Sequence, residues 1–345
     1  MKRRDFTSLM SLATSGSLFV PHFILKKGGQ QESILGHGEF QYKADAKWGV
    51  QNPAVTPVKD CHEMVQDKRG RLILLTNETK NNVIIYDRSG KVLNTWGSNF
   101  PGAHGLTLVE EGGEEFLFIT DHDRFQVYKT TLDGKVLMTL EKPMESGKYE
   151  ADTIYKPTEV TVLPNGDFYV ADGYGSQFIS HYNHKGEFLN IFGGRGDEGH
   201  LFKNAHGVCY DDRDSQNPVL LITARVKNML KRFSLSGEHL GDIALPGAYI
   251  GRPVIDGDNV YLSVLVSKMP WDSKSGFVIV LDKDNKVVSV PGGNLPSYQE
   301  GELQTLNQTN ELFQHPHDVC VDNDKNLYIP QWNSGKTYPI KLQRI

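Results

Sequence analysis

Beyond residue 35, hydrophobic positions come in short runs of Val, Ile, Leu, Tyr and Phe, and helical spacing is nearly absent. Polar turns bound each run, and the dipeptides Ser-Gly, Asp-Gly, Asn-Gly and Lys-Gly recur in them. Short runs of β-branched and aromatic residues between such turns are typical of strands. The pattern therefore predicts an all-β chain.

The strand pattern repeats along the chain. Four segments, which begin at residues 61, 103, 156 and 205, share one order: a polar residue, then four apolar strands separated by turns. Segments that begin at 251 and 316 resemble parts of the same unit. Each unit predicts a four-stranded antiparallel meander, and a period of about 40 to 50 residues with four strands each indicates a propeller. We therefore predict a six-bladed β-propeller over residues 40–345.

The sixth unit offers only three strands before the sequence stops at Ile345. An unassigned strand-like segment, "FQYKADAKWGV", lies at residues 40–50, and its Trp-Gly matches Trp96-Gly97 of the first unit's fourth strand. We expect residues 40–50 to form the outer strand of the last blade. Such pairing closes the ring and removes an exposed sheet edge.

Residues 1–30 differ from the rest in composition. "MKRRDFTSLMSLATSGSLFVP" has a basic start and then a weakly apolar stretch, too short and polar for a membrane span. This is typical of an export signal, and Arg3-Arg4-Asp5-Phe6 resembles the twin-arginine type. A chance Arg-Arg pair is the alternative. We expect a bacterial protein that is periplasmic or exported; without a clear cleavage site, the signal could remain as an anchor.

The charge balance limits the partners. With 37 basic and 42 acidic residues among 345, the net charge is -5, and no basic stripe suggests nucleic acid as a partner. We expect a monomer that takes a small-molecule or peptide substrate. The three cysteines, Cys61, Cys209 and Cys320, leave at least one thiol unpaired.

Histidines recur at one position of the repeat. In a propeller, the residue just before the innermost strand points toward the central channel; His62, His104, His206 and His317 occupy this position, and Thr158 does so in the third unit. Three of them, His104, His206 and His317, fall on alternate blades, about 120° apart around the axis of a six-bladed ring.

Three neutral imidazoles that converge on one point, with a fourth position left to water or substrate, are typical of a catalytic metal site. We therefore predict that His104, His206 and His317 bind zinc or another divalent transition metal. The alternative is that they are structural histidines satisfied within the channel.

The same residues resemble a known family. The repeats resemble NHL repeats, and the chain from about residue 100 onward is similar to the catalytic core of peptidyl-α-hydroxyglycine α-amidating lyase (peptidylamidoglycolate lyase). The resemblance is carried by "AHGLTL", "AHGVCYD", "HPHDVCVD" and "KPTEVTVLPNGDFYVADGYG". It implies a six-bladed propeller with zinc and a structural calcium that cleaves a C–N bond at a hydroxylated carbon.

The resemblance also implies roles for single residues. Tyr174 stands at the family's catalytic tyrosine, a general base on the substrate hydroxyl, and Arg225 stands at an arginine that closes the second strand of the fourth blade, although Ala224 replaces the usual Asp before it. Asp318 stands at an aspartate of the calcium site. A phenol with a pKa near 10 could act as a base only if nearby cations lower that pKa. The alternative for Tyr174 is a strand-end aromatic with its hydroxyl in solvent.

Two positions depart from the family pattern. Asn77 stands where the family has an arginine near the substrate, and an amide cannot replace a bidentate guanidinium clamp. The substrate could therefore have diverged. His62 is additional. We expect His62 and Asn77 to contact substrate, although His62 could also extend the metal site or fill the channel.

The leading hypothesis is an exported metal-dependent lyase. The alternative is a non-catalytic NHL-repeat propeller that binds other macromolecules in the periplasm or at the cell surface, since fold alone does not decide function. A sugar- or lactone-processing propeller with calcium on its axis ranks lower. Calcium prefers oxygen ligands, whereas this channel offers imidazoles.

Overall fold

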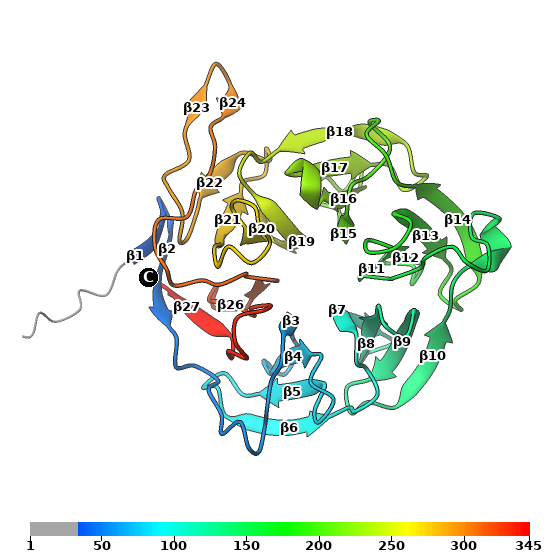
Figure 1. Cartoon of the computed structure of the whole chain (residues 1–345), viewed down its shortest axis with the longest axis horizontal. Helices are drawn as coiled ribbons and strands as arrows, with labels where there is room; N and C mark the ends of the chain where they lie inside the picture. The colour runs from blue at the N-terminus through cyan, green and yellow to red at the C-terminus, as the bar shows by residue number, and fades with distance from the viewer. Residues whose placement is uncertain (1–33) are drawn as a thin grey trace, which may run out of the picture. The chain divides into compact units, whose positions relative to one another are not determined.

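Six antiparallel sheets surround one axis and form a closed ring (Figure 1). The structure is a computed structural model that describes residues 34–345. The predicted six-bladed β-propeller is confirmed. The predicted twin-arginine segment, residues 1–30, lies outside the described residues. Within the described part of the chain, no helix has the length and hydropathy needed to cross a membrane.

The first five blades are meanders whose strands follow one another outward from the axis. The innermost strands are β3 (Cys61–Gln66), β7 (Ala103–Glu111), β11 (Glu159–Val162), β15 (Ala205–Asp211) and β19 (Tyr249–Asp256). The second strands are β4 (Leu72–Thr76), β8 (Glu114–Asp121), β12 (Phe168–Ala171), β16 (Val219–Ala224) and β20 (Asn259–Val266). The third strands are β5 (Val83–Tyr86), β9 (Gln126–Thr131), β13 (Phe178–Tyr182), β17 (Met229–Phe233) and β21 (Phe277–Leu281). The outer strands are β6 (Val92–Trp96), β10 (Val136–Leu140), β14 (Phe188–Gly193), β18 (His239–Ala244) and β22 (Val287–Ser289).

The sixth blade joins the two ends of the described chain. Its inner strands are β25 (Cys320–Val321), β26 (Leu327–Ile329) and β27 (Ile340–Arg344), and β2 (Phe40–Asp45) pairs antiparallel with β27, with Tyr42 opposite Arg344. The short strand β1 (Ile34–His37) adds to the outer edge of β2. The predicted closure by an N-terminal strand is confirmed, and Figure 1 shows the blue and red strands side by side.

The closing strand ends at Asp45 rather than at residue 50. Trp48 lies in the turn that follows, and its ring packs against Tyr86 at 5.2 Å and Tyr328 at 4.6 Å between centroids. These two tyrosines belong to the first and sixth blades. The tryptophan therefore fills the seam between the blades instead of continuing the strand.

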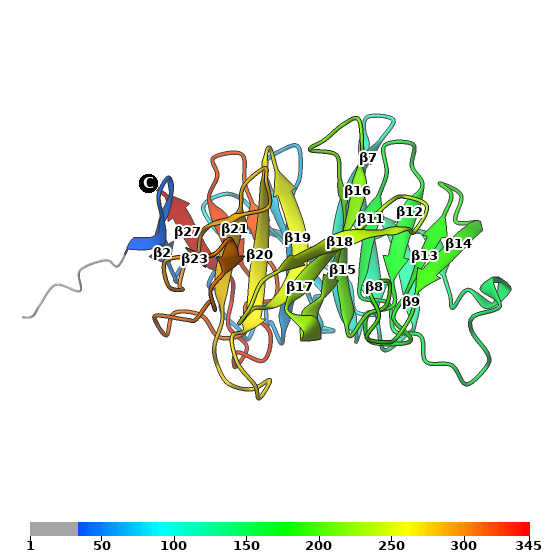
Figure 2. The same ribbon diagram turned by 90° about the horizontal axis from the view of Figure 1, so that it is seen from above.

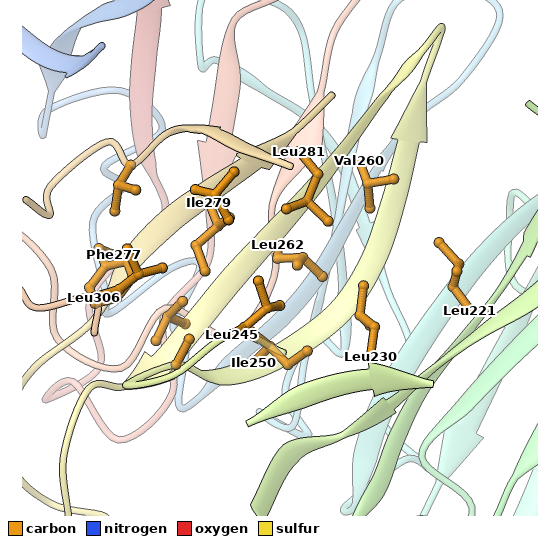
Figure 3. Close-up of a cluster of buried hydrophobic side chains, with 14 of the residues drawn as sticks. Leu221, Leu230, Leu245, Ile250, Val260, Leu262, Phe277, Ile279, Leu281 and Leu306 are labelled. Carbon is orange, nitrogen blue, oxygen red and sulfur yellow. The ribbon is translucent and has the colours of Figure 1, made fainter. Parts of the chain in front are cut away.

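Apolar faces of neighbouring blades pack against each other. Between the fourth and fifth blades, Leu221 and Leu230 meet Leu262, Ile279 and other side chains of one buried cluster (Figure 3). Each blade has two such faces and cannot cover them alone, so burial of this apolar surface drives the blades to stack into a ring. In Figure 2, which views the ring from the side, inner strands such as β19 and β20 run between its two faces.

Few elements lie outside the blades. Two short 3-10 helices, η1 (Met144–Ser146) and η2 (Arg225–Lys227), and one hairpin, β23 (Tyr298–Gln299) with β24 (Glu302–Leu303), complete the described structure. The three cysteines are free thiols; Cys61 and Cys320 are buried and Cys209 is half-buried.

Candidate metal centre

The axial histidines sit at irregularities in the innermost strands. The pairing register shifts between Cys61 and Glu63 in β3, between Ala103 and Leu106 in β7, and between Ala205 and Val208 in β15. These shifts leave His62, His104 and His206 out of the regular ladder. A bulge bends its strand and re-aims the side chain, so the bulges account for why three residues within strands point at the axis.

Four imidazoles meet there. For five of the six ring pairs among His62, His104, His206 and His317, the centroids are 4.6 to 5.1 Å apart. All four side chains are buried. Ring nitrogens of His62, His104 and His317 lie within 4.8 Å of one another, and this buried triad could hold a metal ion. Two of the three predicted ligands, His104 and His317, thus converge together with His62. The third, His206, lies beside them, with its Nε2 3.1 Å from Nε2 of His104.

Hydrogen bonds orient two of the rings. Nδ1 of His104 donates to the carbonyl of Thr158 at 2.9 Å, and Nδ1 of His317 donates to the carbonyl of His62 at 3.0 Å. The Nε2 atom of each of these two rings is then unprotonated, and its lone pair faces the cluster. A second partner that fixes the tautomer in this way is the usual support of a metal-ligating histidine.

The spacing of the ring nitrogens suits a shared ion. Nε2 of His206 lies 3.1 Å from Nε2 of His104, and Nδ1 of His62 lies 3.4 Å from Nε2 of His317. In a tetrahedral site with nitrogen bonds of about 2.0 to 2.1 Å, ligand atoms are separated by roughly 3.3 Å. Without a cation, an N–H of His206 or His62 can donate to the neighbouring lone pair at each of these contacts; a bound cation would take the place of that proton.

Burial keeps the cluster uncharged. It lowers the pKa of His104, His206 and His317 well below the ordinary 6.5, and mutual repulsion among the cationic forms lowers these pKa values further. For His62, burial lowers the pKa to about 3, against the attraction of Asp60. Neutral imidazole is the form that binds a metal, so the site needs no proton release from imidazolium at neutral pH.

Tyr174 and Arg225 flank the cluster. The Tyr174 hydroxyl lies 3.1 Å from Nε2 of His104 and 3.1 Å from Nε2 of His206. Burial raises the pKa of this phenol above 10, and the neighbouring Arg225 guanidinium opposes the rise. Arg225 is itself buried; its Nε donates to the carbonyl of Ile250 at 2.8 Å, and its Nη2 has no partner among the described residues. The hydroxyl therefore faces the histidines and not open solvent.

A pocket of about 280 Å³ opens beside these groups. Its polar lining comes from Tyr174, Asn204, Arg225 and His317. Its apolar lining is Val226, Leu265, Trp271 and Trp332. Few polar groups that converge in an otherwise apolar cavity are typical of a small-molecule site. Substrate could reach the histidine cluster through this pocket.

The two predicted substrate contacts lie elsewhere. Neither His62 nor Asn77 lines the pocket. The Asn77 side chain instead donates to Asp60 Oδ2 at 3.1 Å and accepts from the Asp60 backbone N–H at 2.9 Å. An amide fits this local bonding pattern, whereas a guanidinium could not accept the backbone hydrogen bond. The predicted substrate contact by Asn77 therefore finds no support in the geometry.

Asp318, the predicted calcium ligand, is already paired. Its two carboxylate oxygens accept Arg252 Nε at 2.9 Å and Nη2 at 3.0 Å, and Oδ2 also accepts the Met64 backbone N–H at 3.0 Å. The same guanidinium approaches Glu63 at 3.2 Å and Glu159 at 3.8 Å. Burial raises the pKa of both glutamates, and Arg252 opposes the rise. A calcium ion does not fit here, because a cationic side chain occupies the place between the oxygens.

Several of these residues were not expected from the sequence. Asn204 stands two residues before His206, and Trp271 and Trp332 lie in the bends after the second strands β20 and β26. The residue type at these places differs from unit to unit, so periodicity does not mark them. Arg252 could have been found, because "GRPV" places it one residue after the axial position of the fifth unit, as Asp318 follows His317 in the sixth.

Comparison with known proteins finds sequence relatives among the amidating lyases. No family model matches the chain. Peptidyl-alpha-hydroxyglycine alpha-amidating lyase 1 of Drosophila melanogaster is 29% identical over 269 residues, which cover 71% of this chain and 46% of the fly protein. Peptidyl-glycine alpha-amidating monooxygenase B of Xenopus laevis is 30% identical over 258 residues, 72% of this chain and 27% of the frog protein. The chain resembles the amidating lyases.

The match covers less than half of each of these relatives. Among solved structures, a streptogramin B lyase superimposes with a TM-score of 0.54 over 83% of this chain and 94% of its own, at 13% identity. This likeness shows the fold alone. The sequence relatives, rather than the shared fold, therefore carry the resemblance to the amidating lyases.

Proposed function

We propose that this chain is an exported, metal-dependent lyase that cleaves the C–N bond at a hydroxylated carbon, with a peptidyl-α-hydroxyglycine as the first substrate class. The observation that carries the proposal is the Tyr174 hydroxyl, 3.1 Å from two imidazoles of the buried histidine cluster and on the wall of a pocket. The names of the sequence relatives supply the reaction class. The twin-arginine-like start supports export.

The reaction is balanced without a further reagent. The hydroxyl on the α-carbon loses its proton, its oxygen forms a carbonyl, and the bond from that carbon to the amide nitrogen breaks. The nitrogen takes up a proton, so the products are a peptide amide and glyoxylate. The chain must therefore supply one base and one proton donor near the same carbon.

His104, His206 and His317 would hold the metal, and His62 stands close enough to serve as a further ligand. Convergent nitrogen donors favour zinc over calcium. When bound, such an ion supplies Lewis-acid polarisation of a substrate oxygen. Positive charge at this place would also attract the phenolate form of Tyr174 and so lower the pKa of the phenol.

Tyr174 would accept the hydroxyl proton, and Arg225 would serve two purposes. Its charge already opposes the burial that raises the pKa of the phenol. Its unpartnered Nη2 also offers a charge-assisted hydrogen bond to a substrate carboxylate. Arg225 could thus fill part of the role that Asn77 cannot.

The apolar half of the pocket favours a large apolar group beside the cleaved bond. Trp271 and Trp332 are the largest apolar side chains in the lining, joined by Leu265 and Val226. Burial of an apolar side chain there contributes roughly 1.5 to 3 kcal/mol to binding. We therefore propose peptides in which the residue before the hydroxyglycine is aromatic or aliphatic.

Product analysis tests the proposal. The purified chain, loaded with zinc, is given a synthetic peptidyl-α-hydroxyglycine with phenylalanine before the hydroxyglycine, and glyoxylate and peptide amide are measured together. Equal amounts of both products, at a rate that depends on the metal, support the lyase. Peptide binding without turnover under any metal would favour a non-catalytic binding propeller.

A further inference from the structure

A second ring of charged residues surrounds the axis directly below the histidines. The residues that follow the axial position are Glu63, Glu159, Arg252 and Asp318 in the first, third, fifth and sixth blades. The second and fourth blades have Gly105 and Gly207 there. A Cβ on Gly207 would lie 2.5 Å from Cα of Arg252. Only glycine at position 207 therefore lets the backbone of Arg252 come this close to the fourth blade.

Arg252 uses all three of its guanidinium nitrogens on oxygens from other blades. Nε and Nη2 bind the Asp318 carboxylate of the sixth blade. Nη2 also donates to the Met64 carbonyl of the first blade at 3.1 Å, and Nη1 donates to the Leu106 carbonyl of the second blade at 2.8 Å. Nη1 lies 3.2 Å from the Glu63 carboxylate.

These partners are the oxygens that a hard cation would choose. Carboxylates and backbone carbonyls converging on one point are typical calcium ligands. Here one side chain of the fifth blade supplies the positive charge and reaches the first, second and sixth blades at once. Asp318 and Glu63 are buried, so Arg252 could not be removed without leaving uncompensated charge in the core.

We propose that the Arg252 guanidinium is a built-in substitute for a structural metal ion on the propeller axis, so that the ring is held together without calcium. The pairing ties β3 and β7, beside their bulges, to the fifth and sixth blades. The proposal is independent of the reaction assigned to the site.

The test compares thermal unfolding of the wild-type chain and Arg252→Ala, each in excess calcium and in excess of a calcium-selective chelator, with zinc supplied throughout. The wild-type midpoint should be the same in both. Arg252→Ala should unfold roughly 6 to 15 °C lower in chelator, the range expected when a buried ion pair loses one partner. Calcium should restore part of this loss, because the emptied oxygens can then coordinate the ion.

Arg213→Ala is the matched control. Arg213 also pairs with a buried aspartate, Asp211, but at the loop after β15, with no approach to the axis. Its loss should lower the midpoint without creating a response to calcium. A saturable rise of the wild-type midpoint with calcium would overturn the proposal, and so would an Arg252→Ala protein as stable as wild type. If Arg252→Ala does not fold, calcium titration of the wild-type chain by calorimetry decides: heat of binding refutes the substitution, and its absence supports it.

Discussion

The hydroxyl of Tyr174 lies 3.1 Å from Nε2 of His206, although the two residues belong to different blades and are 32 positions apart. Tyr174 follows β12 in the third blade, whereas His206 occupies a bulge of β15 in the fourth. The contact joins the predicted base to the predicted metal site. The hydroxyl can be removed without disturbing the aromatic ring that packs there. The base and the metal site can therefore be tested separately.

Tyr174→Phe should lower kcat by ~10²- to 10⁴-fold, because general acid–base catalysis contributes about that much. Metal content and the unfolding midpoint should stay at wild-type values, since the aromatic ring remains. Steady-state kinetics with peptidyl-α-hydroxyglycine measures kcat, and metal analysis measures the metal content. Tyr182→Phe is the control: its buried hydroxyl has no partner among the described residues, so its loss should not change kcat. Full activity in Tyr174→Phe would remove the tyrosine from the mechanism.

His104→Ala, His206→Ala and His317→Ala should each sharply lower the zinc bound after dialysis, because each removes one of three convergent nitrogens. His62→Ala should lower affinity less if His62 is only an additional ligand. Metal analysis and an absorption-edge density map measure the two effects. His200→Ala, at an exposed position, should bind zinc as wild type does. Unchanged zinc content in all three triad variants would contradict the site.

The sequence predicted the ring and the histidines because both depend on periodicity. A turn and a strand recur in each unit, and the residue before the inner strand recurs with them. The bulges could not be predicted, since they are shifts in pairing between two strands and leave no mark in one strand's pattern. They explain why His104 points at the axis from within β7 rather than from before it.

Two other features of the site could not be predicted from the repeat. Trp271 and Trp332 reach the pocket from the bends after β20 and β26, where the residue type varies from unit to unit, so only the folded chain brings them together. Asp318 was assigned to calcium by resemblance, without its partner; the position of Arg252 in a neighbouring blade decides what the carboxylate binds. A ligand role therefore cannot be assigned from one residue of an axial ring.

Trp271→Ala should raise KM roughly 5- to 30-fold for a substrate with phenylalanine before the hydroxyglycine, because it removes apolar contact area from the pocket wall. The value of kcat should change little, since this contact is made equally in the bound and reacting substrate. A substrate with glycine in place of phenylalanine is the internal control, and its KM should rise much less. Equal KM increases for both substrates would mean that the tryptophan supports the fold of its loop rather than the substrate side chain.

Removal of residues 1–45 should lower the unfolding midpoint by more than ~10 °C, because it strips β2 from the sixth blade and uncovers the edge of β27. The buried side chains of Phe40 and Tyr42 leave with the strand. Removal of residues 1–33 is the matched control and should leave the midpoint unchanged, since it keeps every strand that the structure describes. Thermal unfolding of both truncations makes the comparison. Equal midpoints would refute closure by β2.

The metal-free protein should lose stability as the pH falls below about 6.5. Burial lowers the pKa of His104, His206 and His317 in the folded state, whereas the unfolded chain has the ordinary value. At a pH between the folded and unfolded pKa values, these histidines are protonated in the unfolded chain but not in the folded chain, so protonation favours unfolding. Above pH 6.5 they are neutral in both states, and their contribution to stability does not change with pH. Each histidine contributes up to about 1.4 kcal/mol per pH unit. Urea unfolding from pH 8 to 5 in chelator measures the slope, and His206→Gln should make it shallower. A metal-free protein equally stable at pH 5 and pH 8 would show that the cluster accepts protons freely and is not the neutral site described above.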